Sequence, residues 1–137
     1  MFFRKTPLLV QKLFPHAYWN FKNSPNLYLT FDDGPHPDST PFLLDVLATN
    51  NIKATFFCLG KNIKSYPHLF QSIIDRGHAV GYHGFNHISG WTTDYEVYMK
   101  NATNLLFDSN LFRPPYGRLT WSQYKSLHSS QKIIMWD

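Results

Sequence analysis

Three short groups of polar residues contain side chains that bind metal ions or move protons. They are Asp32-Asp33, the pair His83 and His87, and the segment Arg113–Tyr116. Two neutral imidazoles and one carboxylate form a common divalent-metal site with open coordination positions. Two adjacent carboxylates repel each other unless their roles are separated, and an ion on one of them leaves the other to act as a base. These residue types therefore suit a metal centre with a neighbouring base.

The histidine pair has a spacing of four, which places two imidazoles on the same side of a helical turn. The chain contains 7 histidines, so that spacing also arises by chance. No Glu follows His83, which excludes the helical motif of zinc proteases.

The other two groups have structural alternatives as well. The aspartates could cap the next helix or hold the turn at Gly34-Pro35, although Asp38 and Ser39 are better placed for capping. Arg113 could form a surface ion pair of little energetic value. The prolines and the glycine after it favour a stiff, irregular loop that aims main-chain N–H groups at a fixed point.

The elements that would position these groups alternate between strand and helix. Hydrophobic patterning and turn signals predict strands at 27–31, 53–59, 78–82, 111–112 and 133–136, and helices at 39–50, 66–76, 93–107 and 121–128. The expected inward positions of two helices are Phe42, Leu43, Val46 and Leu47 in the first, and Val97, Leu105 and Leu106 in the third. This order indicates βαβ units and a parallel sheet, either doubly wound or closed into a barrel. Each polar group follows a strand, where α/β folds build their sites.

Composition narrows the function further. The chain has 137 residues, 43% hydrophobic and 18% aromatic, as expected for one globular domain. The net charge is +4 without any basic cluster, which argues against a nucleic-acid partner. Cys58 is the single cysteine, so there is neither an intramolecular disulfide nor a thiolate zinc site, and its apolar surroundings predict a core position.

Residues 1–25 form a basic, partly apolar segment ahead of the domain predicted at 26–137. Its apolar run is too short to span a bilayer, and it lacks the pattern of a cleavable signal peptide. We therefore expect a cytoplasmic protein or one that is peripheral at the envelope. A short helix between Thr6-Pro7 and Pro15 would lie on a membrane surface or dock on the domain's edge.

Together the three groups resemble the motifs of the polysaccharide deacetylase family, which is carbohydrate esterase family four and has a NodB-like domain. The family motifs TFDDGP, HxxxH and RxPY correspond here to Thr30–Pro35, His83–His87 and Arg113–Tyr116, in the same order. The resemblance runs from about Leu27 to the last residue.

The resemblance implies a distorted (β/α) barrel with a divalent metal, with zinc favoured over cobalt. It implies that Asp33, His83 and His87 bind the metal and that Asp32 is the general base. It further implies that Arg113 holds Asp32 and that the N–H of Tyr116 lies in the oxyanion hole. The implied reaction removes N-acetyl groups from N-acetylglucosamine units of a chitin-like or peptidoglycan-like glycan, with ester hydrolysis as a variant.

The sequence also departs from the family pattern. Gly84 stands where the family usually has Ser or Thr, a hydroxyl expected to steady the metal-binding loop. The family's later Leu-x-His segment, whose histidine protonates the leaving amine, is not present, so we expect an incomplete barrel whose last strands and helices are missing. His36 is a better substitute acid than His128. The alternative function is a catalytically weak, metal- or sugar-binding remnant.

Trp91 and Tyr116 are candidate sugar-stacking side chains. Aromatic rings commonly line grooves for flat ligands such as sugars, although most aromatic residues of a globular domain pack in its core. For Trp91 we expect core packing.

Overall fold

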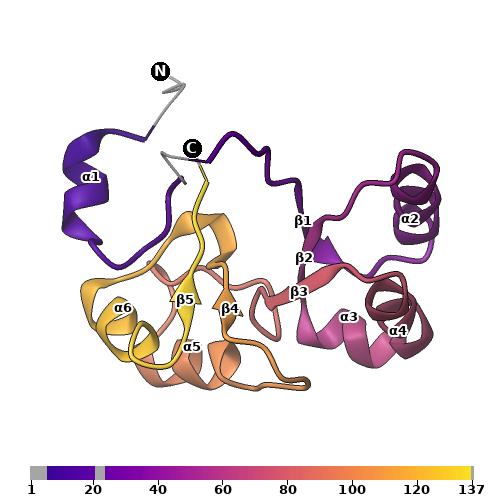
Figure 1. Ribbon diagram of the computed structural model, residues 1–137. Helices are drawn as coiled ribbons and strands as arrows, with labels where there is room; N and C mark the ends of the chain where they lie inside the picture. The colour runs from indigo at the N-terminus through magenta and orange to yellow at the C-terminus, as the bar shows by residue number, and fades with distance from the viewer. Residues whose placement is uncertain (1–5, 21–23, 137) are drawn as a thin grey trace.

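The computed structural model describes residues 6–20 and 24–136, and within them a parallel sheet forms the centre of the molecule (Figure 1). Its strands are β1 (Thr30–Gly34), β2 (Thr55–Cys58), β3 (Ala79–Tyr82), β4 (Leu111–Phe112) and β5 (Lys132–Ile133). Every neighbouring pair is parallel, and the spatial order β1-β2-β3-β4-β5 follows the chain. A doubly wound sheet would reverse its strand order, whereas a (β/α) barrel does not. The predicted α/β class with a barrel-type strand order is confirmed.

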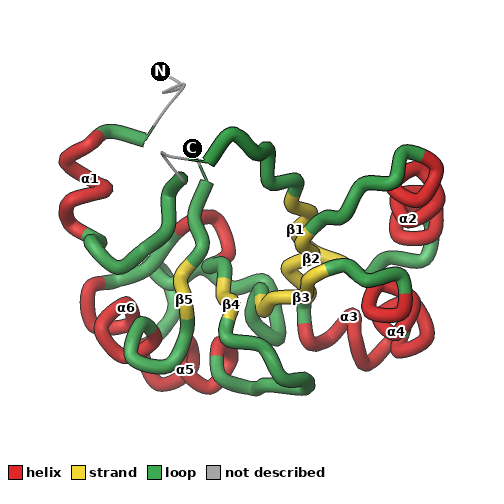
Figure 2. Tube along the Cα trace, in the orientation of Figure 1, coloured by secondary structure: helices red, strands yellow, loops and turns green. Residues whose placement is uncertain are grey.

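One helix precedes the sheet, and the others connect its strands. They are α1 (Leu8–Leu13), α2 (Ser39–Thr49), α3 (Gly60–Ser65), α4 (Pro67–Asp75), α5 (Tyr95–Ala102) and α6 (Trp121–Leu127), with a 3₁₀ turn at Pro115–Gly117. In Figure 1, α2, α3 and α4 lie beside β1, β2 and β3, while α5 and α6 lie beside β4 and β5. Loops join the strand ends to the helices (Figure 2), and those that follow β3 and β4 are longer than the single residue, Leu59, between β2 and α3. The sequence did not indicate α3, and it placed the end of α5 five residues too late.

Local capping chemistry explains two of the helix starts. Thr120 and Gln123 form a reciprocal capping box at α6, and the Asp94 side chain accepts hydrogen bonds from Glu96 N–H and Val97 N–H at α5. Asp38 occupies the N-cap position of α2, as expected, but its side chain makes no capping hydrogen bond.

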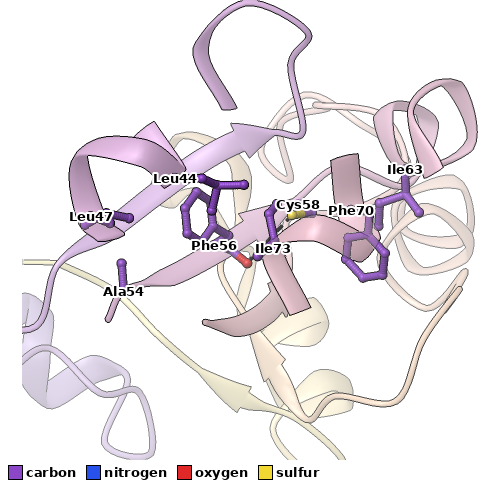
Figure 3. Close-up of a cluster of buried hydrophobic side chains, with 8 residues drawn as sticks. All are labelled: Leu44, Leu47, Ala54, Phe56, Cys58, Ile63, Phe70 and Ile73. Carbon is purple, nitrogen blue, oxygen red and sulfur yellow. Dashed lines mark hydrogen bonds between the residues drawn. The ribbon is translucent and has the colours of Figure 1, made fainter. Parts of the chain in front are cut away.

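One hydrophobic cluster packs α2, α3 and α4 onto β2 (Figure 3). Its buried members are Leu44, Leu47, Ala54, Phe56, Cys58, Ile63, Phe70 and Ile73. Fully burying such a side chain stabilises the fold by about 1.5–3 kcal/mol. Burial, with a smaller contribution from the charge of Asp32, raises the pKa of the Cys58 thiol to about 12. Cys58 is thus an inert core residue, as predicted.

The predicted inward faces of two helices were partly wrong. On α2 the buried positions are Thr40, Leu44 and Leu47, while Phe42 and Val46 are exposed. On α5 the buried positions are Tyr98, Asn101 and Ala102, and Val97 is exposed. Leu105 and Leu106 are also exposed, because the helix ends before them. A polar residue, Asn101, occupies an inward position that a hydrophobic pattern does not reveal.

The N-terminal segment lies along β5. Tyr18 forms a parallel bridge with Ile134, and Phe14 and Ala17 pack against a second cluster built around Tyr82, Phe112 and Tyr124. The predicted helix near Thr6-Pro7 is present as α1. Residues 1–5 and 21–23 of the predicted N-terminal segment lie outside the described residues. Within 6–20 and 24–136, no helix has both the length and the apolar character needed to cross a bilayer.

His78 gives the fold a pH-dependent stability. Its buried ring accepts the Ala54 N–H at Nδ1 over 3.2 Å and lies against Phe56. Burial and then the charges of Lys53 and Arg76 lower the pKa of His78 below the ordinary value of 6.5. Since the unfolded chain binds this proton more readily, stability is complete above about pH 6.5 and is lost as the pH falls.

We predict that His78→Asn, which keeps an acceptor near Ala54 N–H, weakens this pH dependence. The free energy of unfolding in urea, measured at pH 7.5 and 5.5, should fall less in the variant, by up to about 1.4 kcal/mol per pH unit. His68→Asn, at an exposed position on α4, is the matched control and should behave as wild type. Equal slopes in wild type and His78→Asn would contradict the assignment.

Candidate metal centre and active site

A β-bulge at Asp33 brings both aspartates to the end of β1. Asp32 pairs with Phe57 and Gly34 pairs with the next residue, Cys58, so Asp33 is an additional residue on this strand. Asp33 has a positive φ of 67°. In a regular strand, adjacent side chains point to opposite faces, and a bulge re-aims one of them. The strand predicted to end at Phe31 in fact continues through the bulge.

The two histidines follow β3 on a loop. His83 and His87 are not on a helical turn, so that part of the sequence interpretation was wrong. The loop nevertheless brings the rings together, with centroids 5.0 Å apart at an interplanar angle of 49°. The close approach that the spacing suggested therefore arises from an irregular backbone.

The three predicted metal ligands converge. Asp33 Oδ1 lies 3.6 Å from His83 Nε2 and 3.4 Å from His87 Nε2. One ligand atom from each residue lies within 4.8 Å of the other two. Tetrahedral coordination with bonds of about 2.0–2.1 Å separates ligand atoms by about 3.4 Å. The three side chains fit a divalent ion.

A hydrogen bond fixes the tautomer of His83. His83 Nδ1 lies 2.6 Å from the Arg113 carbonyl oxygen, which can only accept, so Nδ1 carries the proton. Burial is the largest influence on this ring and lowers its pKa, against the opposing charges of Asp32 and Asp33. His83 is therefore a neutral imidazole at pH 7, with the Nε2 lone pair directed towards Asp33. Metal-binding histidines usually have this kind of support.

Arg113 itself is 4% exposed, although it carries a full charge. Its Nη1 donates to Asp32 Oδ1 over 2.9 Å and to Thr30 Oγ1 over 2.8 Å. Its Nε and Nη2 donate to the carbonyl oxygens of Ile134 and Met135 over 3.4 and 3.3 Å. The guanidinium also lies 4.2 Å above the Phe57 ring. The surface-pair alternative is wrong, because this charge is buried, paired and stacked.

Tyr116 lies at the edge of the same site. Its backbone is left-handed, with φ 59° and ψ 7°, and its ring packs edge-on against His87 with centroids 4.4 Å apart. Within the part of the chain that the structure describes, the Tyr116 N–H has no hydrogen-bond acceptor. A free, rigidly placed N–H is the kind of group that forms an oxyanion hole.

The candidate acids are placed differently. His36 lines a cavity of about 180 Å³ together with Asp32 and Asp33. Its Nδ1 accepts the Asp38 N–H over 3.3 Å. His128 instead packs between His16 and Tyr124 at the end of α6.

Sequence reasoning missed two supporting residues. Thr30 accepts from Arg113, and Asn62 Nδ2 donates to the Asp33 carbonyl oxygen over 2.7 Å. Thr30 belongs to the first motif, which is a usable signal. Asn62 lies on α3, which the sequence did not indicate.

An aromatic surface extends from the candidate metal centre. The Arg118 guanidinium lies 5.1 Å from the Trp91 ring and 5.6 Å from the Tyr116 ring. Trp91 is 64% exposed, so its expected core position was wrong. Its indole N–H donates to the Leu119 carbonyl oxygen over 3.2 Å, which fixes the ring in place.

The chain is similar to known polysaccharide deacetylases. The family model for polysaccharide deacetylase matches residues 22–131. A peptidoglycan-N-acetylglucosamine deacetylase of Bacillus cereus is 31% identical over 96% of this chain and 51% of its own length. A chitooligosaccharide deacetylase of Azorhizobium caulinodans is 42% identical over 74% of this chain and 51% of its own length.

Solved structures show the same likeness. The crystal structure of the Bc1960 peptidoglycan N-acetylglucosamine deacetylase superposes with a TM-score of 0.84 at 29% identity, over 94% of this chain and 64% of that one. The chain therefore belongs to the polysaccharide deacetylase family. It spans about half the length of the two curated relatives.

We predict that Arg113→Met lowers the free energy of unfolding by about 1–3 kcal/mol, because it removes the hydrogen bond to Asp32 and leaves the carbonyl oxygens of Ile134 and Met135 without this donor. Asp32→Asn removes the carboxylate that Arg113 pairs with, so the double variant should be less destabilised than the sum of the two single variants. The free energy of unfolding in urea is measured, in the presence of a chelator, for wild type, the two single variants and the double variant. Strict additivity would show that the two side chains are not energetically coupled.

Proposed function

We propose that this chain carries the catalytic site of a metal-dependent hydrolase that removes N-acetyl groups from a glycan. The observation that carries the proposal is the convergence of Asp33, His83 and His87 beside a carboxylate held by Arg113. The similarity to deacetylases of peptidoglycan and chitooligosaccharides supports N-acetylglucosamine units as the substrate class.

We assign the metal ligands to Asp33, His83 and His87, with zinc as the ion. Two imidazoles and a carboxylate at this spacing are a donor set that zinc accepts, and they leave coordination positions open. Such an ion, when bound, polarises a carbonyl group and makes a water molecule easier to deprotonate. The neutral, oriented ring of His83 needs no proton loss before it binds.

Asp32 is the proposed general base. The 2.9 Å charge-assisted contact with Arg113 Nη1 fixes the position of its carboxylate. It would take a proton from the water that attacks the acetyl carbon, a step that contributes about 10²–10⁴ in rate. The charge that develops on the carbonyl oxygen would be met by the free Tyr116 N–H, worth about 3–4 kcal/mol for a good donor.

We predict that Asp32→Asn and Asp33→Ala have different effects on zinc affinity, although both lower the rate of acetate release. Asp33→Ala removes a ligand and should lower zinc affinity at least tenfold, and acetate release with it. Asp32→Asn keeps every ligand, so zinc should bind within about threefold of wild type while acetate release falls by about 10²–10⁴. Zinc affinity is measured by competition with a chromogenic chelator, and acetate is measured on chitooligosaccharides and on peptidoglycan fragments.

The outcomes separate the alternatives. Zinc bound by wild type with no acetate released from either substrate would support the binding remnant in place of the enzyme. Zinc that binds equally to wild type and Asp33→Ala would refute the assigned ligands. Acetate released from an acetylated ester but not from an amide would redirect the proposal to O-deacetylation.

We also propose that Trp91 is a sugar-stacking platform. Its ring is exposed and held by Leu119, and it is linked through Arg118 to Tyr116 at the metal centre. Trp91→Ala should raise KM for a chitooligosaccharide about tenfold and change kcat little, while Trp91→Phe keeps a stacking face and should lie between them. An unchanged KM in Trp91→Ala would show that Trp91 does not stack against the bound sugar.

A further inference from the structure

Gly84 leaves the loop between the two histidines without the hydroxyl expected to steady it. Gly84 has a positive φ of 81°. A Cβ atom added there would lie 2.7 Å from Asn101 Nδ2. A side chain of α5 therefore occupies the space above Gly84.

That side chain is hydrogen-bonded to the loop. Asn101 Oδ1 accepts the Asn86 N–H over 2.6 Å, directly before His87. Asn101 also accepts at its backbone, since its carbonyl oxygen receives the Phe85 N–H over 2.9 Å. The carbonyls in the last turn of a helix lack partners within the helix, so this second bond satisfies a group that α5 leaves open. Two consecutive N–H groups of the loop are thus fixed by one residue.

The loop's carbonyl groups are fixed from the opposite direction. Gly84 O accepts from Gly60 N–H and Phe85 O accepts from Lys61 N–H, each over 3.0 Å. The loop is therefore clamped between the start of α3 and the end of α5. The two hydrogen bonds from α3 join backbone groups, so a side-chain substitution does not remove them. Among the four hydrogen bonds that hold the loop, only the one to Asn101 Oδ1 involves a side chain.

Burial makes the contact with Asn101 energetically significant. Asn101 is 8% exposed, and its Nδ2 has no hydrogen-bond partner within residues 6–20 and 24–136. Burying an amide without full satisfaction is costly. A buried amide at an inward position of α5 is therefore unfavourable by itself. Its presence there is explained if the Oδ1 contact with the loop has a function of its own.

We propose that Asn101 is a positioning residue for the metal centre, in place of the hydroxyl that Gly84 lacks. It holds the backbone of Phe85 and Asn86, and through them sets the separation of His83 and His87. The proposal rests on the proposed metal-binding function, but the anchoring of the loop is tested separately. Groups of this kind typically change metal affinity 10–100-fold when removed.

Two variants of nearly equal size separate the hydrogen bond from the packing. Asn101→Leu removes the acceptor, whereas Asn101→Asp keeps an acceptor oxygen and replaces the unpartnered NH₂ group with a second carboxyl oxygen. In the metal-free protein, hydrogen exchange of the Asn86 amide should be at least tenfold faster in Asn101→Leu than in wild type, and within threefold of wild type in Asn101→Asp. Zinc affinity should fall 10–100-fold in Asn101→Leu and less than threefold in Asn101→Asp.

Ala102→Gly is the control, because it loosens the same helix at the next position without removing the acceptor. It should leave Asn86 exchange and zinc affinity near the wild-type values at a temperature where all variants are folded. If Asn101→Leu does not fold, the smaller Asn101→Ala replaces it in both measurements.

The outcomes are distinct. Unchanged Asn86 exchange in Asn101→Leu, or an equal loss of zinc affinity in Ala102→Gly, overturns the role of Asn101. If wild type binds no zinc at all, the proposed function fails, and the Asn86 exchange rates alone decide whether Asn101 anchors the loop.

Discussion

The arrangement of the site depends on burying one positive charge. Arg113 is almost fully buried, and burying its permanent charge is tolerable only because its donors are satisfied. It draws acceptors from the start of β1 and from the segment after β5, which are distant in the sequence. Its carbonyl oxygen meanwhile orients His83. A single residue therefore sets the position of the proposed base at one end and the tautomer of a proposed ligand at the other.

Irregular backbone brings the remaining groups into place. Asp33 occupies a bulge and Tyr116 a left-handed turn, and both have positive φ values that non-glycine residues seldom adopt. Gly84 does the same between the histidines. Such conformations persist where the surroundings over-determine them. Around Asp33 and Gly84 those surroundings are β2, α3 and α5, and around Tyr116 they are the His87 ring and Arg118. The regular helices and strands supply most of the buried hydrophobic core, while the short distorted segments orient the side chains of the site.

Much of the fold and of the site's composition was predictable from the sequence. Alternating strands and helices, with polar groups after the strands, indicated a parallel sheet and the edge where Asp33 and His83 meet. The predictions that were wrong have physical explanations. Phe42 and Trp91 were assigned inward by hydrophobicity alone, although large apolar side chains also form part of any protein surface. Asn101 could not be found, because a buried amide is identifiable only from the partner it meets in three dimensions.

The spacing of the proposed metal ligands along the chain has a thermodynamic consequence. Asp33 and His83 are 50 positions apart, and they approach each other only when β1, β2 and β3 have assembled. An ion bound by both Asp33 and His83 would act as a cross-link that exists only in the native state. By mass action it would raise stability by about 2.7 kcal/mol at a free concentration 100 times its dissociation constant. The supply of such an ion would then govern how long the folded chain survives proteases as well as whether it can react.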